Sequence, residues 1–112
     1  MHNNDILFDK IRTEIIKWIE DNISRFEEER INVEVVNNNR DNYSVVFDFN
    51  NCMAEININQ PDFAPYRYVS FEVVAIVDNE SKLIYSWYDD DNTNIEEIIF
   101  QLNKGIEYAT NY

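Results

Sequence analysis

The sequence is poor in glycine, proline, cysteine and histidine, with one, two, one and one residue among 112. Gly105 is the single glycine, which excludes a glycine-rich phosphate-binding loop. His2 is the single histidine and stands at the N-terminus, which argues against Ser-His-Asp, Cys-His and histidine-metal sites. Cys52 has no partner for a disulfide, and its alternating apolar neighbours predict a buried side chain.

Basic residues are also scarce, with 9 Lys and Arg against 22 Asp and Glu, and the net charge is −13. The imbalance is concentrated in residues 31–112, which hold fourteen of the acids and four of the bases. Such a field repels nucleic acid and anionic membranes and attracts basic proteins. The sequence therefore predicts a basic protein partner, no nucleic acid and no membrane. The alternative interpretation is that the charge serves only solubility.

Long apolar runs are absent as well. No stretch approaches the roughly 20 residues that cross a membrane, and the N-terminus lacks the features of a signal peptide, so we expect a cytoplasmic protein. Seventeen Asn and fifteen Ile beside one Gly are typical of an AT-rich bacterial genome. With 45% apolar and 14% aromatic residues, the chain is predicted to form a single folded domain over residues 1–112.

Apolar periodicity predicts a helix at each end of the chain. Apolar residues recur every three or four positions across residues 4–29 and again across 95–106. The first helix carries Trp18 on its apolar face, so this ring should be buried. The second helix starts with a capping box of Thr93 and Glu96, and we expect it to fray beyond Gly105.

Five segments of alternating polarity between the helices predict strands, over residues 31–35, 43–49, 52–59, 68–77 and 82–88. The polar residues 37–42 and the proline-containing residues 60–65 are predicted loops, and residues 78–81 are the predicted turn of a hairpin. Short connections favour antiparallel neighbours. The predicted fold is therefore α+β, with an N-terminal helix, a five-stranded, mainly antiparallel meander sheet and a C-terminal helix, both helices on one face.

The run Asp89 to Asp91 is the densest charge in the chain and offers oxygen ligands for a hard cation. It lacks the glycine that bends a calcium loop and the glutamate at the twelfth loop position, so we expect no metal site. Two strand carboxylates could converge as an acid–base pair, but nothing in the sequence selects a pair. We expect no catalytic residue, no cofactor and no enzyme activity.

The remaining candidate is a protein-binding surface at the end of the predicted hairpin. Aromatic residues beside concentrated negative charge are typical of an interface for a basic protein. Strand alternation places Trp87 in the core with Leu83 and Tyr85, and displays Tyr88. The predicted partner-binding residues are Tyr88, Asp89, Asp90, Asp91, Glu96 and Glu97.

The order of elements resembles bacterial immunity proteins of the TriTu type, with WIEDN in the first helix, INVEV in the first strand and IYSWYDDD at the end of the last strand. Members of that family protect against ADP-ribosylating toxins aimed at elongation factor Tu. The resemblance implies a non-catalytic immunity protein that binds and neutralises a toxin domain, and it carries over no catalytic residue. The alternative is a small structural or adaptor domain that forms a homodimer through a sheet edge or through an outer face carrying Val74 and Ile76.

Overall fold

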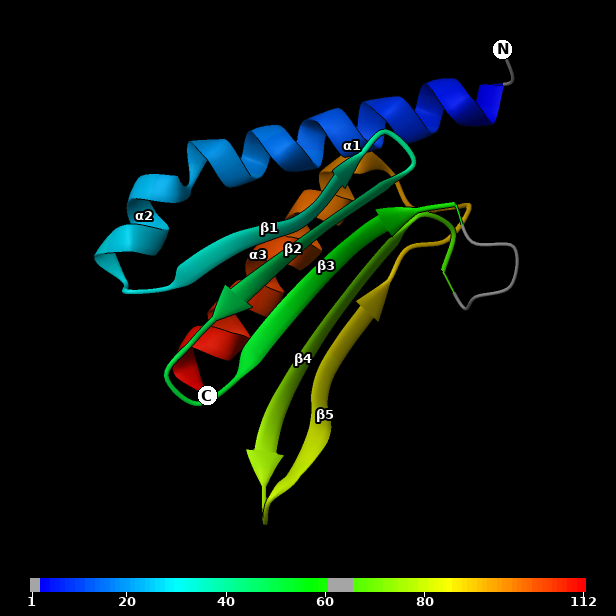
Figure 1. The fold of residues 1–112 in the computed structure, drawn as a ribbon. Helices are drawn as coiled ribbons and strands as arrows, with labels where there is room; N and C mark the ends of the chain where they lie inside the picture. Colours follow the sequence, from blue (N-terminus) through cyan, green and yellow to red (C-terminus); the bar gives the residue numbers. More distant parts are fainter. Residues whose placement is uncertain (1–2, 61–65) are drawn as a thin grey trace.

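The computed structural model describes residues 3–60 and 66–112, with side chains from residue 6 onward. Its elements are α1 (Asn3–Asp21), α2 (Ile23–Glu28), β1 (Asn32–Asn39), β2 (Asn42–Asp48), β3 (Met53–Asn59), β4 (Val69–Val77), β5 (Glu80–Tyr88) and α3 (Ile95–Asn111). The strands form one antiparallel sheet in the order β1-β2-β3-β4-β5 (Figure 1). The predicted α+β meander is therefore confirmed. His2 and most of the predicted loop over 60–65 lie outside the described residues.

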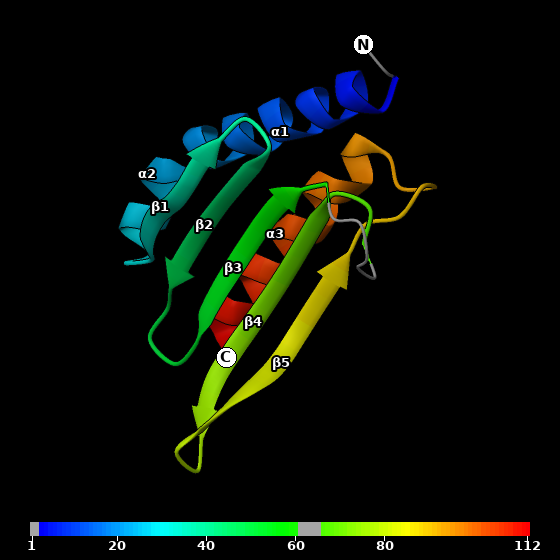
Figure 2. The same cartoon turned by 45° about the vertical axis from the view of Figure 1, so that its right-hand side comes forward.

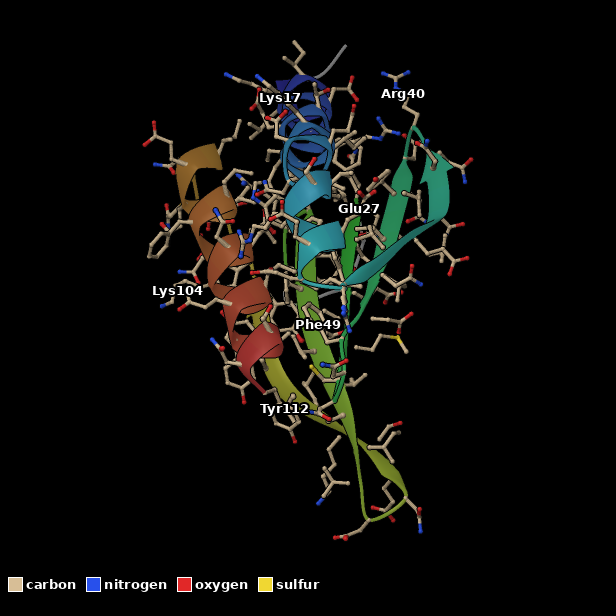
Figure 3. The ribbon with its side chains drawn as sticks, turned by 90° about the vertical axis from the view of Figure 1, so that its left-hand side faces the viewer. Lys17, Glu27, Arg40, Phe49, Lys104 and Tyr112 are labelled. Carbon is tan, nitrogen blue, oxygen red and sulfur yellow. The ribbon has the colours of Figure 1, made fainter. Side chains whose placement is uncertain are left out.

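Both long helices cover one face of the sheet, and α3 crosses behind β3 and β4 (Figure 2, Figure 3). The strand side chains on that face are apolar and buried, and they pack with the apolar sides of the helices in one cluster. Trp18 is 7% exposed, which confirms its predicted burial. Its indole Nε1 donates to Asn103 Oδ1 at 3.0 Å, a bond that joins α1 to α3.

The single helix predicted over residues 4–29 is instead two helices that meet at Asn22. The Asn22 side chain donates to the Trp18 carbonyl at 2.7 Å, and such local bonds compete with a continuous helix. Arg30 follows α2 in the left-handed region, with φ 61°, and its backbone N–H donates to the Glu27 carbonyl at 3.1 Å. This closing arrangement ends α2 and turns the chain into β1.

The polar loop predicted over residues 37–42 is mostly strand. β1 and β2 extend until only Arg40 and Asp41 separate them. A contact with α1 supports the extended strand, because Arg12 Nη2 donates to Asn38 Oδ1 at 2.7 Å. Pairing of the two strands and docking against the helix therefore outweigh the turn propensity of the asparagine run.

The β4–β5 hairpin turns at Asp78 and Asn79, which have φ values of 54° and 66°. Two consecutive residues with positive φ make the type I′ turn that suits the twist of antiparallel strands. Glycine is usual in this turn, but Asp and Asn tolerate the left-handed region better than other residues. The turn is thus two residues long, and β5 begins two residues earlier than predicted.

A bulge in β5 changes which side chains face the helices. Val73 is paired with Tyr85, whereas the next residue, Val74, is paired with Leu83, so Ile84 is an extra residue in this edge strand. Paired residues project from the same side of a sheet. Leu83 therefore faces away from the helices while Tyr85 faces them, and the prediction that the two share one face is wrong.

α3 starts one residue later than its predicted capping signature. Asn94 rather than Thr93 is the N-cap, and its Oδ1 accepts the Glu97 backbone N–H at 2.8 Å. The prediction of fraying beyond Gly105 is also wrong, because α3 continues as a regular helix. A Cβ on Gly105 would lie 2.6 Å from the Phe71 ring, so the missing side chain allows α3 to pack closely on β4.

Candidate functional site

The face of the sheet that points away from the helices is here named the open face, because no described helix or strand packs against it (Figure 3). The strand register assigns its residues. Its side chains form rows across the sheet, and the central row runs from β1 to β5 through Glu34, Val46, Glu55, Glu72 and Ser86. The open face is therefore continuous over all five strands.

The charge of the open face has one sign. Four carboxylates lie on it, from Glu34, Asp48, Glu55 and Glu72. Lys82 is the only basic residue in the five described strands, and it is paired with Ala75, which faces the helices. The open face thus presents negative charge without a basic strand residue to compensate it, which attracts basic groups over long range.

Two of these carboxylates stand directly opposite each other. Glu55 on β3 is paired with Glu72 on β4, and like charges in such positions destabilise a sheet. Asn57 Nδ2 donates to Glu55 Oε1 at 2.9 Å, and the Tyr88 hydroxyl donates to Glu72 Oε2 at 2.7 Å. The hydrogen bond to Glu72 raises the pKa of Tyr88, because the carboxylate favours the protonated hydroxyl. Both donors are neutral, so the glutamates are oriented without being neutralised.

Polar and aromatic side chains order one end of the open face. The Ser44 hydroxyl donates to Asn57 Oδ1. The Tyr66 hydroxyl donates to Asn59 Oδ1 at 3.2 Å, and its ring stacks on Tyr88 with centroids 6.0 Å apart and planes at 16°. Side chains held in this way lose little conformational entropy when a partner binds.

The opposite end of the open face is apolar. Met53, Ile76 and Leu83 are 42%, 70% and 54% exposed, and Val74 lies between them in the register. A shallow hollow of about 360 Å³ is lined by Met53, Val74 and Ile76, with Asp48 contributing a carboxylate. Apolar side chains beside charge on one surface are typical of protein interfaces.

Asp89 does not fit the prediction that it contacts a partner, because its side chain is fully buried. Its Oδ1 accepts the backbone N–H groups of Arg67, Tyr68 and Val69 at 3.0, 2.9 and 2.9 Å. Its Oδ2 pairs with Arg67 Nε at 3.1 Å. The carboxylate thus fastens the start of β4 to the end of β5, and its function is structural.

The other predicted residues do not form one surface. Tyr88 lies half-buried on the open face, and Trp87 packs against the core on the helix side, as alternation predicts. The turn after β5 and the first turn of α3 expose the remaining four, Asp90, Asp91, Glu96 and Glu97. α3, which carries the two glutamates, lies on the helix side of the sheet (Figure 2), whereas Tyr88 is on the open face.

Asp90 is exposed but is bonded within its own turn. Its Oδ1 accepts the Asn92 backbone N–H at 2.8 Å and the Thr93 hydroxyl at 3.0 Å. These hydrogen bonds lower the pKa of Asp90, because they stabilise the carboxylate. The side chain shapes the turn that leads into α3.

The sequence-based site omits the three glutamates of the open face, Glu34, Glu55 and Glu72. Each occupies a polar position in an alternating strand, which is the signal that could have identified them. Alternation alone gives the face of one strand but not its register with the next. The pairing of Glu55 with Glu72 is therefore visible only in the folded sheet.

Within the described residues, no three His, Cys, Asp or Glu side chains are grouped as metal ligands would be. No described helix is both long and apolar enough to span a membrane. Comparisons with protein families, with characterised proteins and with solved structures give no match for this chain. The function must therefore be inferred from the charge, exposure and geometry of the surface.

Proposed function

We propose that this protein is a non-catalytic binding domain that recognises a basic protein through its open face, and that this partner is a bacterial toxin domain which it neutralises as an immunity protein. The observation that carries the proposal is an uncovered sheet face with four carboxylates, no basic strand residue and an exposed apolar end. Charge of one sign accelerates encounter with a basic partner, and apolar area supplies affinity once the surfaces meet.

The two sheet edges are less suited to binding than the face. β1 and β5 are the edge strands, and each contains a bulge, at Val36 and at Ile84. Bulges interrupt the row of backbone groups that another strand would pair with, and natural proteins use them to protect edges. This arrangement favours a partner that packs on the face over one that extends the sheet.

The alternative of a homodimer through the open face is disfavoured by charge. In a two-fold contact the same patch meets itself, so the four carboxylates of each copy would face one another. Each chain carries a net charge of −13, which adds to the repulsion. We expect a monomer by sedimentation equilibrium at low salt. A dimer under that condition would support the adaptor function instead.

The proposal predicts that a toxin domain is encoded beside this gene, and that domain is the probe. The chain should bind that domain and protect cells that express it, and its association should slow with added salt, which screens charges beyond about 8 Å at physiological ionic strength. Absence of both binding and protection would reject the immunity function, and on-rates that do not change with salt would reject electrostatic recognition.

A matched pair of variants locates the contact. The double substitution Glu55→Gln and Glu72→Gln removes two charges from the open face, and Glu96→Gln with Glu97→Gln removes two from α3. We expect association to slow more for the first pair than for the second. Equal effects would show that net charge alone drives association, and a larger effect of the second pair would place the contact on α3.

A further inference from the structure

A second surface feature lies away from the open face, in a cleft of about 540 Å³ between β5 and the C-terminal half of α3. Its lining residues are Tyr85, Lys104, Glu107, Tyr108, Asn111 and Tyr112. The volume is within the range of ligand sites in proteins, and the lining combines aromatic rings with a few polar groups as such sites do. Tyr108 and Tyr112 remain 40% and 44% exposed, so two rings are accessible to a ligand.

The three tyrosines form a ladder with a fixed base. Tyr85 and Tyr108 stack with ring centroids 5.0 Å apart and planes at 28°. Tyr112 continues the ladder, 6.3 Å from Tyr108 and tilted by 35°. The Phe71 ring meets Tyr85 edge to face at 6.0 Å, which ties the ladder to the core. The negative faces of the outer rings are thus held in place beside the cleft.

The charges around the cleft favour a cation. α3 has no basic residue in its last turn, so the negative end of the helix dipole has no side-chain counter-charge there. Glu107 adds a carboxylate to the lining. Lys104 also lines the cleft, but its Nζ lies 5.6 Å from the centre of the Phe100 ring, one turn earlier in the helix. Figure 3 shows Lys104 on α3 at a distance from the C-terminal end of the helix, where Tyr112 lies.

We propose that this cleft binds the guanidinium group of an arginine side chain presented by a polypeptide. A planar cation can stack on a tyrosine face and donate hydrogen bonds to Glu107, whereas a lysine ammonium cannot stack in this way. The proposal does not depend on binding at the open face, because Tyr85 and α3 lie on the other side of the sheet. Either surface can fail its test without affecting the other.

The probe is the tripeptide acetyl-Gly-Arg-Gly-amide, titrated into isotope-labelled protein while the aromatic NMR signals are followed. The matched control replaces arginine with citrulline, which has nearly the same shape but no charge. We expect shifts concentrated at Tyr85, Tyr108 and Tyr112, and roughly fivefold weaker binding of the citrulline peptide. Equal affinity for both peptides, or shifts concentrated on the open face, would overturn the proposal.

Surface variants test the assigned contacts. Tyr108→Leu keeps apolar area but removes the ring face, and it should abolish the shifts at Tyr85 and Tyr112. Glu107→Gln should weaken arginine binding about two- to fivefold. Lys104→Gln removes the competing cation, so binding should be unchanged or stronger. Unaltered binding by both Tyr108→Leu and Glu107→Gln would reject the site, and if Tyr108→Leu fails to fold, Glu107→Gln alone decides.

Discussion

The two faces of the sheet are formed by the same strands but differ in what their side chains contribute. On β4, Phe71 and Val73 face the helices and are fully buried, whereas Ile76 faces solvent and is 70% exposed. The helix face removes apolar surface from water, which stabilises the fold. The open face places Glu72 opposite Glu55 and leaves apolar side chains in water, and neither arrangement stabilises the isolated chain.

This difference supports the proposed binding function of the open face. A sheet face that merely meets solvent is expected to carry mixed charges and few large apolar residues. The open face instead carries four acidic residues and no basic strand residue. Substitutions compare the two faces directly, because changes on the helix face should damage the fold and changes on the open face should not.

The largest effect is expected within β4 itself. Phe71→Ala removes a fully buried ring that packs against Gly105, so it should lower the free energy of unfolding by about 3–5 kcal/mol. Ile76→Ala removes an exposed side chain from the same strand and should change it by at most about 0.5 kcal/mol. Urea denaturation measures both. Similar losses would mean that Ile76 is covered and that the open face is not open.

The second-largest loss of stability is expected at Asp89, and Asp91 in the same acidic run is its control. Asp89→Asn removes the charge that pairs with Arg67, whose side chain is 13% exposed, and should destabilise the protein by about 1.5–3 kcal/mol. Asp91→Asn changes an exposed residue and should have almost no effect. Thermal and chemical unfolding of both variants gives the comparison. If Asp89→Asn is as stable as the parent, the buried ion pair does not fasten β4 to β5.

These residues also show what the sequence could and could not predict about the site. Asp89, Asp90 and Asp91 look equivalent in the chain, and only the fold places Arg67 beside the first of them. The face on which Tyr88 lies is predicted correctly, because alternation depends only on its own strand. Glu55 and Glu72 are missed, because their pairing depends on the register of two strands.

The fold was more predictable than the site because its main signals are local. The burial of Trp18 follows from the spacing of apolar residues along one helix. Two features depend on distant contacts and were therefore predicted wrongly. The bulge at Ile84 turns the Leu83 side chain to the open face. The role of Gly105 depends on Phe71, which lies far away in the sequence.

The third effect concerns the packing of α3 on the helix face. Gly105→Ala improves helix propensity by roughly 1 kcal/mol, but the new methyl group would overlap the Phe71 ring, and overpacking costs about 1–3 kcal/mol. We expect a net loss of about 1 kcal/mol. The control is the same substitution combined with Phe71→Leu, where the methyl group should cost less. A stabilised Gly105→Ala protein would show that α3 does not need this close approach.

The smallest effect is expected on the open face, and its sign is opposite. Glu55→Gln removes the like charge opposite Glu72 but keeps the Oε1 that accepts the Asn57 hydrogen bond. The free energy of unfolding should rise by about 0.2–1 kcal/mol at low salt, and the gain should shrink as salt screens the repulsion. Glu34→Gln is the control, because Glu34 is paired with Val46 and has no acid directly opposite.

The same Glu55→Gln protein connects stability to binding. Glu55→Gln is expected to stabilise the free chain. If the open face binds a basic partner, the same substitution should also slow association, because it removes one of the two charges that attract a cation. Stopped-flow association and chemical denaturation, measured on one sample at two salt concentrations, give both quantities. A protein that becomes no more stable would show that the Glu55–Glu72 repulsion is already relieved in the free chain. A protein that is more stable and associates as fast as the parent would show that the glutamate pair is not part of the contact.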